Sequence, residues 1–377
     1  MSPEIYDDDF NYAVNIVRTI LWSIGAWPGP VSSSTPMKIV YRIQKVITYF
    51  LFLVTIVPPL LYTFLKEKNR RTQLKLIGPI CNSSMQFVKY SILLYRAEDI
   101  RKSIGMIDKD WLSSSKEERE ILRSKAQLGR RLVWTSVFFM FGGGLCYRTI
   151  VPLLRGKIVT AENVTFRPLP CPSYYILFNE QATPFYEIIF TLQFFAGVLS
   201  YSVTSGCCGI SAFFVLHVCS QLRILINKMK ELAEGNDFDV KITVENSMTE
   251  YISFFEILGG TFLTCFVGFY EWESSNAIGL ITYMLLLTSF IFCVFIYCYI
   301  GQQLNNEVLL DTNVGRTSIT INWYRLPVRT ARCLTLVIVV SNHAMKLVAG
   351  KMFDMSFATF TDVSTNMSTV RVDKLYT

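Results

Sequence analysis

A stretch of 25 residues without a single charge, at positions 277–301, constrains this chain more than any other feature of its sequence. The hydrocarbon core of a bilayer is about 30 Å thick, and about 20 helical residues cross it. A soluble helix rarely stays apolar around its whole circumference over that length. The composition agrees, because 51% of the 377 residues are hydrophobic and only 17% are charged. The sequence therefore indicates a polytopic membrane protein.

Six further apolar stretches define the expected fold class, an all-α membrane protein with seven transmembrane helices. The first should bend near Pro58 and Pro59. The fourth has 35 uncharged residues, too many for one perpendicular crossing, so it should tilt or project into water. The helices are expected at residues 46–65, 76–95, 132–154, 188–222, 251–270, 277–301 and 333–350, with a weaker apolar piece at 355–366.

The distribution of basic residues predicts the orientation of these helices. With a cytoplasmic N-terminus, the segments inside the cell hold 22 Lys and Arg residues and the loops outside hold eight. Cytoplasmic loops of membrane proteins carry the excess of positive charge. We therefore expect the N-terminus in the cytoplasm and, after seven crossings, the C-terminus outside. The sequon at Asn163 would then lie outside, where a glycan can be attached.

No catalytic or cofactor-binding motif is recognisable, so we expect neither an enzyme nor a cofactor, and no nucleic-acid partner. The only histidines, His217 and His343, are far apart and are interpreted as hydrogen-bonded packing residues rather than metal ligands. Most of the ten cysteines lie in or beside the spans and should behave as small apolar residues. Cys146 and Cys171 could meet near the outer surface and form a disulfide.

Glycines and a few charges interrupt the apolar stretches. The run 142–144, which is Gly-Gly-Gly, favours close helix approach or local flexibility. Lys89 and Arg148 could extend toward the membrane surface, since their long stems allow the charge to snorkel. Ionisable residues at depth are costly and often functional. These charges form neither the arginine ladder of a voltage sensor nor the acid pairs of a proton pump.

Aromatic side chains are concentrated in the second to fourth expected helices. At helical spacing such residues usually pack the core, and this is the simpler interpretation. A cavity that they line would also suit a small volatile or lipophilic ligand, through dispersion and shape. The candidate contacts for such a ligand are Phe87, Tyr90, Phe139, Tyr147, Phe190, Phe194 and Tyr283.

Several short motifs follow one another along the last half of the chain. They are LHVCSQL at 216–222, GQQL at 301–304, NWY at 322–324 followed by Leu326-Pro327, AGK at 349–351 and SFATF at 356–360. Their order and spacing, together with the number of spans, resemble the insect odorant receptor family. The chain departs from that family's pattern in a shorter segment at 244–256 and in a polar tail after Thr365.

The resemblance implies a ligand-gated, non-selective cation channel of four subunits in the plasma membrane of a sensory neuron dendrite. An odorant-specific subunit would pair with a common co-receptor, and the odorant would bind among the outer halves of helices 2 to 6. Residues 1–45 would be a cytoplasmic segment, 46–222 would carry helices 1–4 and the ligand pocket, and 223–377 would carry the anchor and pore. The anchor would include Trp323, Tyr324 and Pro327, and the pore Thr365, Thr369, Val370 and Arg371.

Three alternatives were weighed against this interpretation. A G-protein-coupled receptor requires an outside N-terminus, which the charge distribution opposes. The related gustatory receptor family shares the architecture, but its usual Thr-Tyr…Gln-Phe ending is not found after Phe360. A secondary transporter is disfavoured because no internal inverted repeat is evident.

Overall fold

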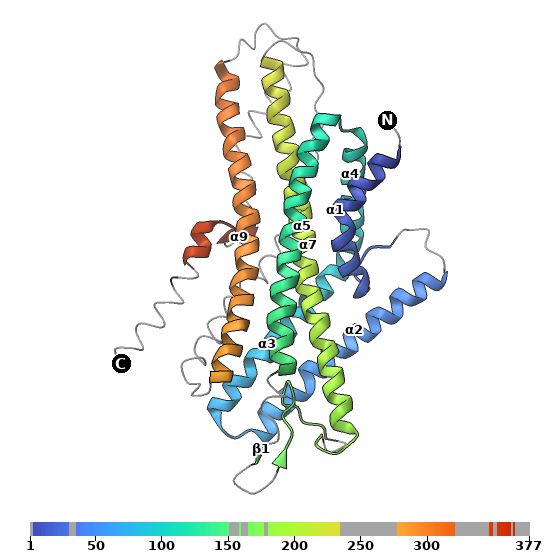
Figure 1. The fold of residues 1–377 in the computed structure, drawn as a ribbon, viewed down its shortest axis with the longest axis vertical. Coiled ribbons are helices and arrows are strands. Elements are labelled where there is room, and N and C mark those ends of the chain that lie inside the picture. Colours follow the sequence, from blue (N-terminus) through green and yellow to red (C-terminus); the bar gives the residue numbers. More distant parts are fainter. Residues whose placement is uncertain are drawn as a thin grey trace.

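A computed structural model of the protein describes residues 3–29, 35–150, 158–159, 165–176, 180–233, 277–320, 347–349, 353–362 and 365. Three long helices run lengthwise along one another, and shorter helices flank them (Figure 1). The long helices are α5 (Lys116–Leu145), α7 (Phe185–Ala233) and α9 (Ala277–Thr320). The all-α class expected from the sequence is therefore confirmed for the described part of the chain, apart from two minimal hairpins.

Helix α7 far exceeds what one membrane crossing needs. It contains 49 residues, which corresponds to about 73 Å at 1.5 Å per residue. A hydrocarbon core of about 30 Å leaves much of this helix outside it. The predicted excess length of this apolar segment is confirmed, and α7 packs along both α5 and α9.

The flanking helices include elements that the hydropathy pattern did not predict. They are α1 (Pro3–Ser23) and α4 (Ala97–Ser113), whereas α2 (Thr35–Leu61) and α3 (Arg70–Tyr95) cover the first two expected spans. The unexpected helices are amphipathic rather than uniformly apolar. In α4, for example, Ile100, Ile107 and Trp111 are buried at helical spacing. α5 also begins well before residue 132, with a capping box between Ser115 and Glu118.

Three helices among the described residues are long and apolar enough to cross a membrane: Thr35–Lys66, Phe185–Lys228 and Leu287–Val308. The first continues through Pro58 and Pro59 and passes into a π-helical turn, η1 (Tyr62–Lys66). α3 and α5 are helical where spans were expected but are more polar. α5 is followed by a second π-helical turn, η2 (Cys146–Ile150).

Two hydrophobic clusters hold the bundle together. One joins α1, α2, α3, α4, α5 and α7 around fully buried residues such as Leu21, Tyr90 and Ile210. The other joins α5, α7 and α9, with Tyr297 and Cys208 at its centre. Cysteines serve both clusters as small apolar residues, as expected.

A short hairpin replaces the end of the seventh expected helix. β3 (Val348–Ala349) pairs antiparallel with β4 (Phe353–Asp354), so the prediction of helix through residue 350 is wrong at its end. The N–H of Met355 donates to the carbonyl of Leu347 at 2.8 Å, which extends the pairing. A Cβ atom on Gly301 of α9 would lie 2.3 Å from the Met355 carbonyl oxygen. The missing side chain at Gly301 therefore lets the hairpin backbone rest directly on α9.

Several expectations fall outside the described residues. The helix expected at 251–270 and most of that at 333–350 lie there, as do His343 and Asn163. The number of spans and the sides of the two termini therefore stay predictions. The expected anchor and pore residues that also lie outside the described residues are Trp323, Tyr324, Pro327, Thr369, Val370 and Arg371.

Candidate functional site: the loop-covered end of the bundle

A buried glutamine fastens the loop before α7 to the end of the bundle where α5 ends and α7 begins. Gln193 on α7 has none of its surface exposed. Its Oε1 accepts from the Cys171 N–H at 3.0 Å, and its Nε2 donates to the Cys171 carbonyl at 2.9 Å and to the Ser173 hydroxyl at 2.8 Å. The amide thus pairs with the loop backbone as a neighbouring strand would, and satisfies groups that are shielded from water.

Arg148, in η2, supports this arrangement on the same face of α7, because its partners Gln193, Gly197 and Tyr201 follow one another at intervals of four residues. Its Nη1 donates to the Gln193 main-chain carbonyl at 3.0 Å, and its Nε donates to the Tyr201 hydroxyl at 3.2 Å. A Cβ atom on Gly197 would lie 2.4 Å from the Arg148 Cδ atom, so only glycine leaves room for the arginine stem. Instead of extending freely toward the surface, the half-buried Arg148 donates both of these hydrogen bonds to α7. Lys89 is also enclosed by protein, with 3% of its surface exposed.

Gly144 shows why the glycine run lies where it does. A Cβ atom there would lie 2.1 Å from the Cζ atom of Tyr201, whereas a Cβ atom on Gly142 would meet nothing within 4 Å. Close helix approach, one of the two interpretations of this run, is therefore confirmed at Gly144.

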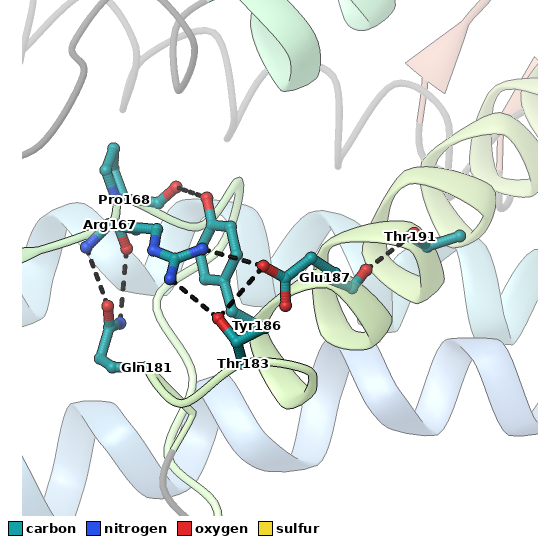
Figure 2. Close-up of polar contacts among 7 residues, drawn as sticks. All are labelled: Arg167, Pro168, Gln181, Thr183, Tyr186, Glu187 and Thr191. Carbon is teal, nitrogen blue, oxygen red and sulfur yellow. Dashed lines mark hydrogen bonds and ion pairs between the residues drawn. The ribbon is translucent and has the colours of Figure 1, made fainter.

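A second polar cluster closes the loop onto the first turn of α7 (Figure 2). Arg167 donates from Nη1 to Glu187 Oε1 at 2.9 Å and from Nη2 to the Thr183 hydroxyl at 3.0 Å. Its guanidinium lies over the Tyr186 ring, 4.9 Å from the centroid, and the Tyr186 hydroxyl donates to the Pro168 carbonyl at 3.0 Å. Two loop segments and one helix start are thus joined by a single arginine.

The loop also contacts α2. The Tyr174 N–H donates to the Pro58 carbonyl at 3.1 Å. Lys66, at the end of η1, lies 3.2 Å from Glu180 and 5.0 Å from the Tyr174 ring centroid. The loop therefore connects α2 with α7 across this end of the molecule.

Cys171, in the loop, is a free cysteine of low reactivity. Cys146 and Cys171 are both free, so the disulfide considered from the sequence is absent. Burial raises the pKa of the Cys171 thiol to about 11, despite the opposing effect of Arg148. The thiol is therefore protonated near neutral pH, and a protonated thiol is a poor nucleophile.

Two of the predicted ligand contacts belong to a packed aromatic group between α2 and α3. Tyr90 is fully buried, its ring centroid lies 5.3 Å from that of Tyr49 and 6.0 Å from that of Phe52, and its hydroxyl donates to the Ile24 carbonyl at 2.9 Å. Phe87 lies edge-on to Tyr49 at 5.4 Å. These contacts hold α1, α2 and α3 together.

The other predicted contacts lie on α5, η2, α7 and α9. Phe139 meets Phe292 of α9 with ring centroids 4.1 Å apart. Phe190 and Phe194 are half-buried on α7, on either side of Gln193 in sequence. The side chains of Tyr147 and Tyr283 lie outside the described residues. Phe87 and Tyr90 of α3 thus pack in the cluster that also includes α1 and α2.

A cavity of about 30 Å³ lies toward the other end of the bundle, between α1, α4, α5 and α7. Its lining includes Trp111, Lys125, Phe213 and His217. This volume holds about two water molecules and is too small for an odorant. None of the five predicted ligand residues with described side chains lines it.

The same end carries ion pairs between the long helices around the buried carboxylate of Glu307. Lys125 of α5 lies 2.7 Å from Glu307 of α9, and Arg223 of α7 lies 3.5 Å from the same carboxylate. His217 Nε2 lies 3.1 Å from Asp110 Oδ2, so its interpretation as a hydrogen-bonded packing residue is confirmed. Within the described residues no group of three or more His, Cys, Asp or Glu side chains could hold a metal ion.

The family model described as 7tm Odorant receptor matches residues 72–251 and 242–367. The chain belongs to the insect odorant receptor family. The resemblance recognised in its motifs is therefore confirmed, and the family is one of receptors rather than enzymes. Comparison with curated protein sequences gave no match.

Solved structures show that the receptor shares its fold with an insect relative. The insect olfactory receptor OR5 from Machilis hrabei in complex with eugenol aligns with a TM-score of 0.77 and 12% sequence identity, over 97% of this chain and 99% of that one. Another structure of OR5 aligns over the same shares with a TM-score of 0.73 and 11% identity. Identities this low show the common fold alone.

Sequence reasoning missed most of the receptor's polar contacts. Gln193 is the one amide in the first half of a long apolar run, and this isolation was an available signal. Arg167 and Glu180 lie in a loop that carries no periodic pattern, so nothing in the sequence could pair them with residues of other segments.

Proposed function

We propose that this receptor is the odorant-specific subunit of a ligand-gated, non-selective cation channel in the plasma membrane, assembled with the family's co-receptor. The observation that carries the proposal is the family match over most of the chain, together with the likeness to an olfactory receptor across 97% of it. The four-subunit arrangement is carried over from the family.

The proposed ligand is a small, largely apolar molecule. OR5 was solved with eugenol, a small aromatic compound. This receptor carries Phe139, Phe190 and Phe194 on its long helices, and the loop held by Gln193 covers the end of α7 where two of them lie. With Tyr147 and Tyr283, these rings would bind an odorant by dispersion and burial. Phe87 and Tyr90 are proposed as contacts from the α3 side.

Conduction is proposed to depend on the C-terminal segment. Thr365, which is helical and exposed, would begin the pore wall and be followed by Thr369, Val370 and Arg371. The subunit anchor would include Trp323, Tyr324 and Pro327. A fixed cation such as Arg371 repels permeating cations, so its position decides how much this subunit contributes to conduction.

Co-expression with the co-receptor in oocytes, followed by current recording with a panel of volatile compounds, tests the proposal. We expect odorant-evoked cation current from the pair and little from the chain alone. A receptor that reaches the surface with its co-receptor and stays silent to every compound would contradict the channel role. Surface labelling of an N-terminal tag in intact cells would contradict the cytoplasmic N-terminus expected from the distribution of basic residues.

Neighbouring phenylalanines provide matched controls for the ligand contacts. Phe138 and Phe195 are 72% and 53% exposed, next to Phe139 and Phe194 respectively. Phe139→Ala or Phe194→Ala should raise the half-maximal odorant concentration about tenfold, because each removes apolar contact area worth about 25 cal/mol per Å². Phe138→Ala and Phe195→Ala should leave it unchanged. If the half-buried and the exposed phenylalanine of a pair have equal effects, the proposed contact with the odorant is contradicted.

Tyr90 needs a separate test because its ring also packs the bundle. Tyr90→Phe removes only the hydroxyl that binds the Ile24 carbonyl. A shift in odorant ranking with this variant, at unchanged surface expression, would support ligand contact. A loss of expression without a change in ranking would identify Tyr90 as a packing residue.

A further inference from the structure

The first three turns of α2 present charge along one side. Lys38, Arg42 and Lys45 follow one another at intervals of four and three residues, which places them on one face of the helix. Lys38 and Arg42 are exposed, and Lys45 is half-buried. We call these three residues the basic stripe. From Thr35 to Lys66 the sequence contains no acidic residue that would neutralise it.

The opposite side of the same turns is apolar and uncovered. Its side chains are between 43% and 64% exposed. Exposure of a continuous apolar face to water is unfavourable. A helix with one basic and one apolar side is instead suited to lie in the interface of a membrane. This apolar face consists of Ile39, Val40, Ile43, Val46 and Ile47.

Contacts with the end of α1 indicate where this segment meets the membrane surface. Gly25, with a φ of +68°, lies so close to α2 that a Cβ atom would be 2.9 Å from the Gln44 Cβ atom. Trp22 beside this turn is 46% exposed, and Trp27 lies next to Arg18, with 6.0 Å from the Arg18 Cζ atom to the ring centroid. Tryptophan and arginine side chains gather at the boundary between lipid and water.

The length of the span leads to the same boundary. The apolar helix Thr35–Lys66 contains 32 residues, about 48 Å. A hydrocarbon core of about 30 Å uses about 20 of them. The turns before Val46 are therefore surplus to the crossing, and they are the turns that carry the basic stripe.

We propose that residues 35–47 are a binding site for anionic phospholipids. The basic stripe binds their headgroups, and the apolar face lies in the adjoining acyl-chain region. A lipid fits both sides at once, since the apolar face continues into the transmembrane part of α2, which a water-soluble partner could not follow. The inference concerns the lipid-facing surface and does not depend on ligand gating.

Lipid retention provides the first test. The full-length receptor would be reconstituted in vesicles of phosphatidylcholine and phosphatidylserine at four to one, extracted in mild detergent, and analysed for retained lipid by mass spectrometry. Neutralising the basic stripe with Lys38→Gln, Arg42→Gln and Lys45→Gln should lower retained phosphatidylserine at least threefold. High salt should lower wild-type retention, because screening weakens the attraction.

Two control variants make the retention result specific. The first removes the same charge from exposed lysines of α4 and α5 with Lys102→Gln, Lys109→Gln and Lys116→Gln, and should retain phosphatidylserine like wild type. The second exchanges Lys and Arg within the basic stripe and should also retain it. Thermal unfolding measurements would show that the neutralised and wild-type receptors are both folded. If the two then retain phosphatidylserine equally, the proposal is overturned.

Label accessibility tests the orientation of the segment independently. Spin labels would be placed at Ile43→Cys on the apolar face or at Lys38→Cys on the basic stripe, and the signal of the unsubstituted receptor subtracted. Oxygen, which dissolves in lipid, should broaden the spectrum of the label at position 43 more than that of the label at position 38. A water-soluble nickel complex should have the opposite preference and broaden the spectrum of the label at position 38 more. Equal access of the nickel complex to both positions would place the segment in water and overturn the proposal.

Discussion

The side-chain amide of Gln193 makes both main-chain hydrogen bonds to Cys171, at 3.0 and 2.9 Å. The side chain of a helix residue thus pairs with the loop backbone as a neighbouring strand would, although the two residues are 22 positions apart in sequence. The main-chain carbonyl of Gln193 itself accepts a hydrogen bond from Arg148. The loop-covered end is therefore held by polar contacts that depend on one another.

Replacing Gln193 by Leu should unfold this end of the receptor more easily. The variant keeps the volume but leaves the Cys171 N–H and carbonyl buried without their partner, which costs about 1–3 kcal/mol. Thermal unfolding of the detergent-solubilised receptor measures the loss. Thr191→Val is the matched control, since the Thr191 hydroxyl is exposed and bonds within its own helix to the Glu187 carbonyl. Equal stability of the two variants would show that the amide contacts are not needed.

Alanine substitutions in the glycine run should differ sharply between two positions. Gly144→Ala places a methyl group against the Tyr201 ring, and such overpacking costs about 1–3 kcal/mol. Gly142→Ala meets nothing within 4 Å and should be neutral or slightly stabilising. Unfolding temperatures of the two variants measured side by side decide the matter. The prediction fails if Gly144→Ala is as stable as Gly142→Ala.

The ion pair between Lys125 and Glu307 should matter more than exposed pairs do. Its side chains are only 12% and 5% exposed, so Glu307→Gln leaves a buried cation without its full partner and should cost about 3–5 kcal/mol. Glu98→Gln, which breaks an exposed pair with Arg101, should cost about 0–1 kcal/mol. Chemical denaturation of both variants provides the comparison.

A double variant separates the two contributions to that cost. Lys125→Met with Glu307→Met removes both buried charges and should recover most of the stability lost in Glu307→Gln, because the one cation that loses its partner, Arg223, is 53% exposed and solvated by water. A double variant no more stable than Glu307→Gln would indicate that packing, rather than charge, dominates at this site.

Acidification should weaken the contact between α5 and α7 at Glu118. Burial raises the pKa of this carboxyl, but hydrogen bonds from Lys228 and Ser115 outweigh that effect, and the pKa lies below its ordinary value of 4.5. The stabilisation is therefore fully present above pH 4.5 and is lost as the pH falls through the lowered pKa. Wild type should lose more stability than Glu118→Gln between pH 7 and pH 3.

An exposed carboxylate on the same turn provides the control for the acid experiment. Glu120→Gln should show the same pH dependence as wild type, since Glu120 faces solvent. Denaturation midpoints over the pH series measure all three proteins. Parallel curves for wild type and Glu118→Gln would contradict the role of Glu118.

Much of the fold was predictable because it follows from local composition. Uncharged runs in α7 and α9 specified long helices, since in a bilayer the backbone must satisfy its own hydrogen bonds. Motifs near the end of the chain identified the family. Helices α1 and α4 were not predicted, because their apolar residues form one stripe that gains stability only by packing on the bundle.

The sequence by itself determined the class of this protein, the position of its most apolar helices and its family. Only the tertiary structure decided which residues meet. Gln193 with Cys171, Arg148 with Gly197, and Lys125 with Glu307 come from segments that carry no mark of their partners. Hydrophobicity acts along each segment and can be read locally. Hydrogen bonds and ion pairs depend on distance and direction, which exist only once the helices have packed.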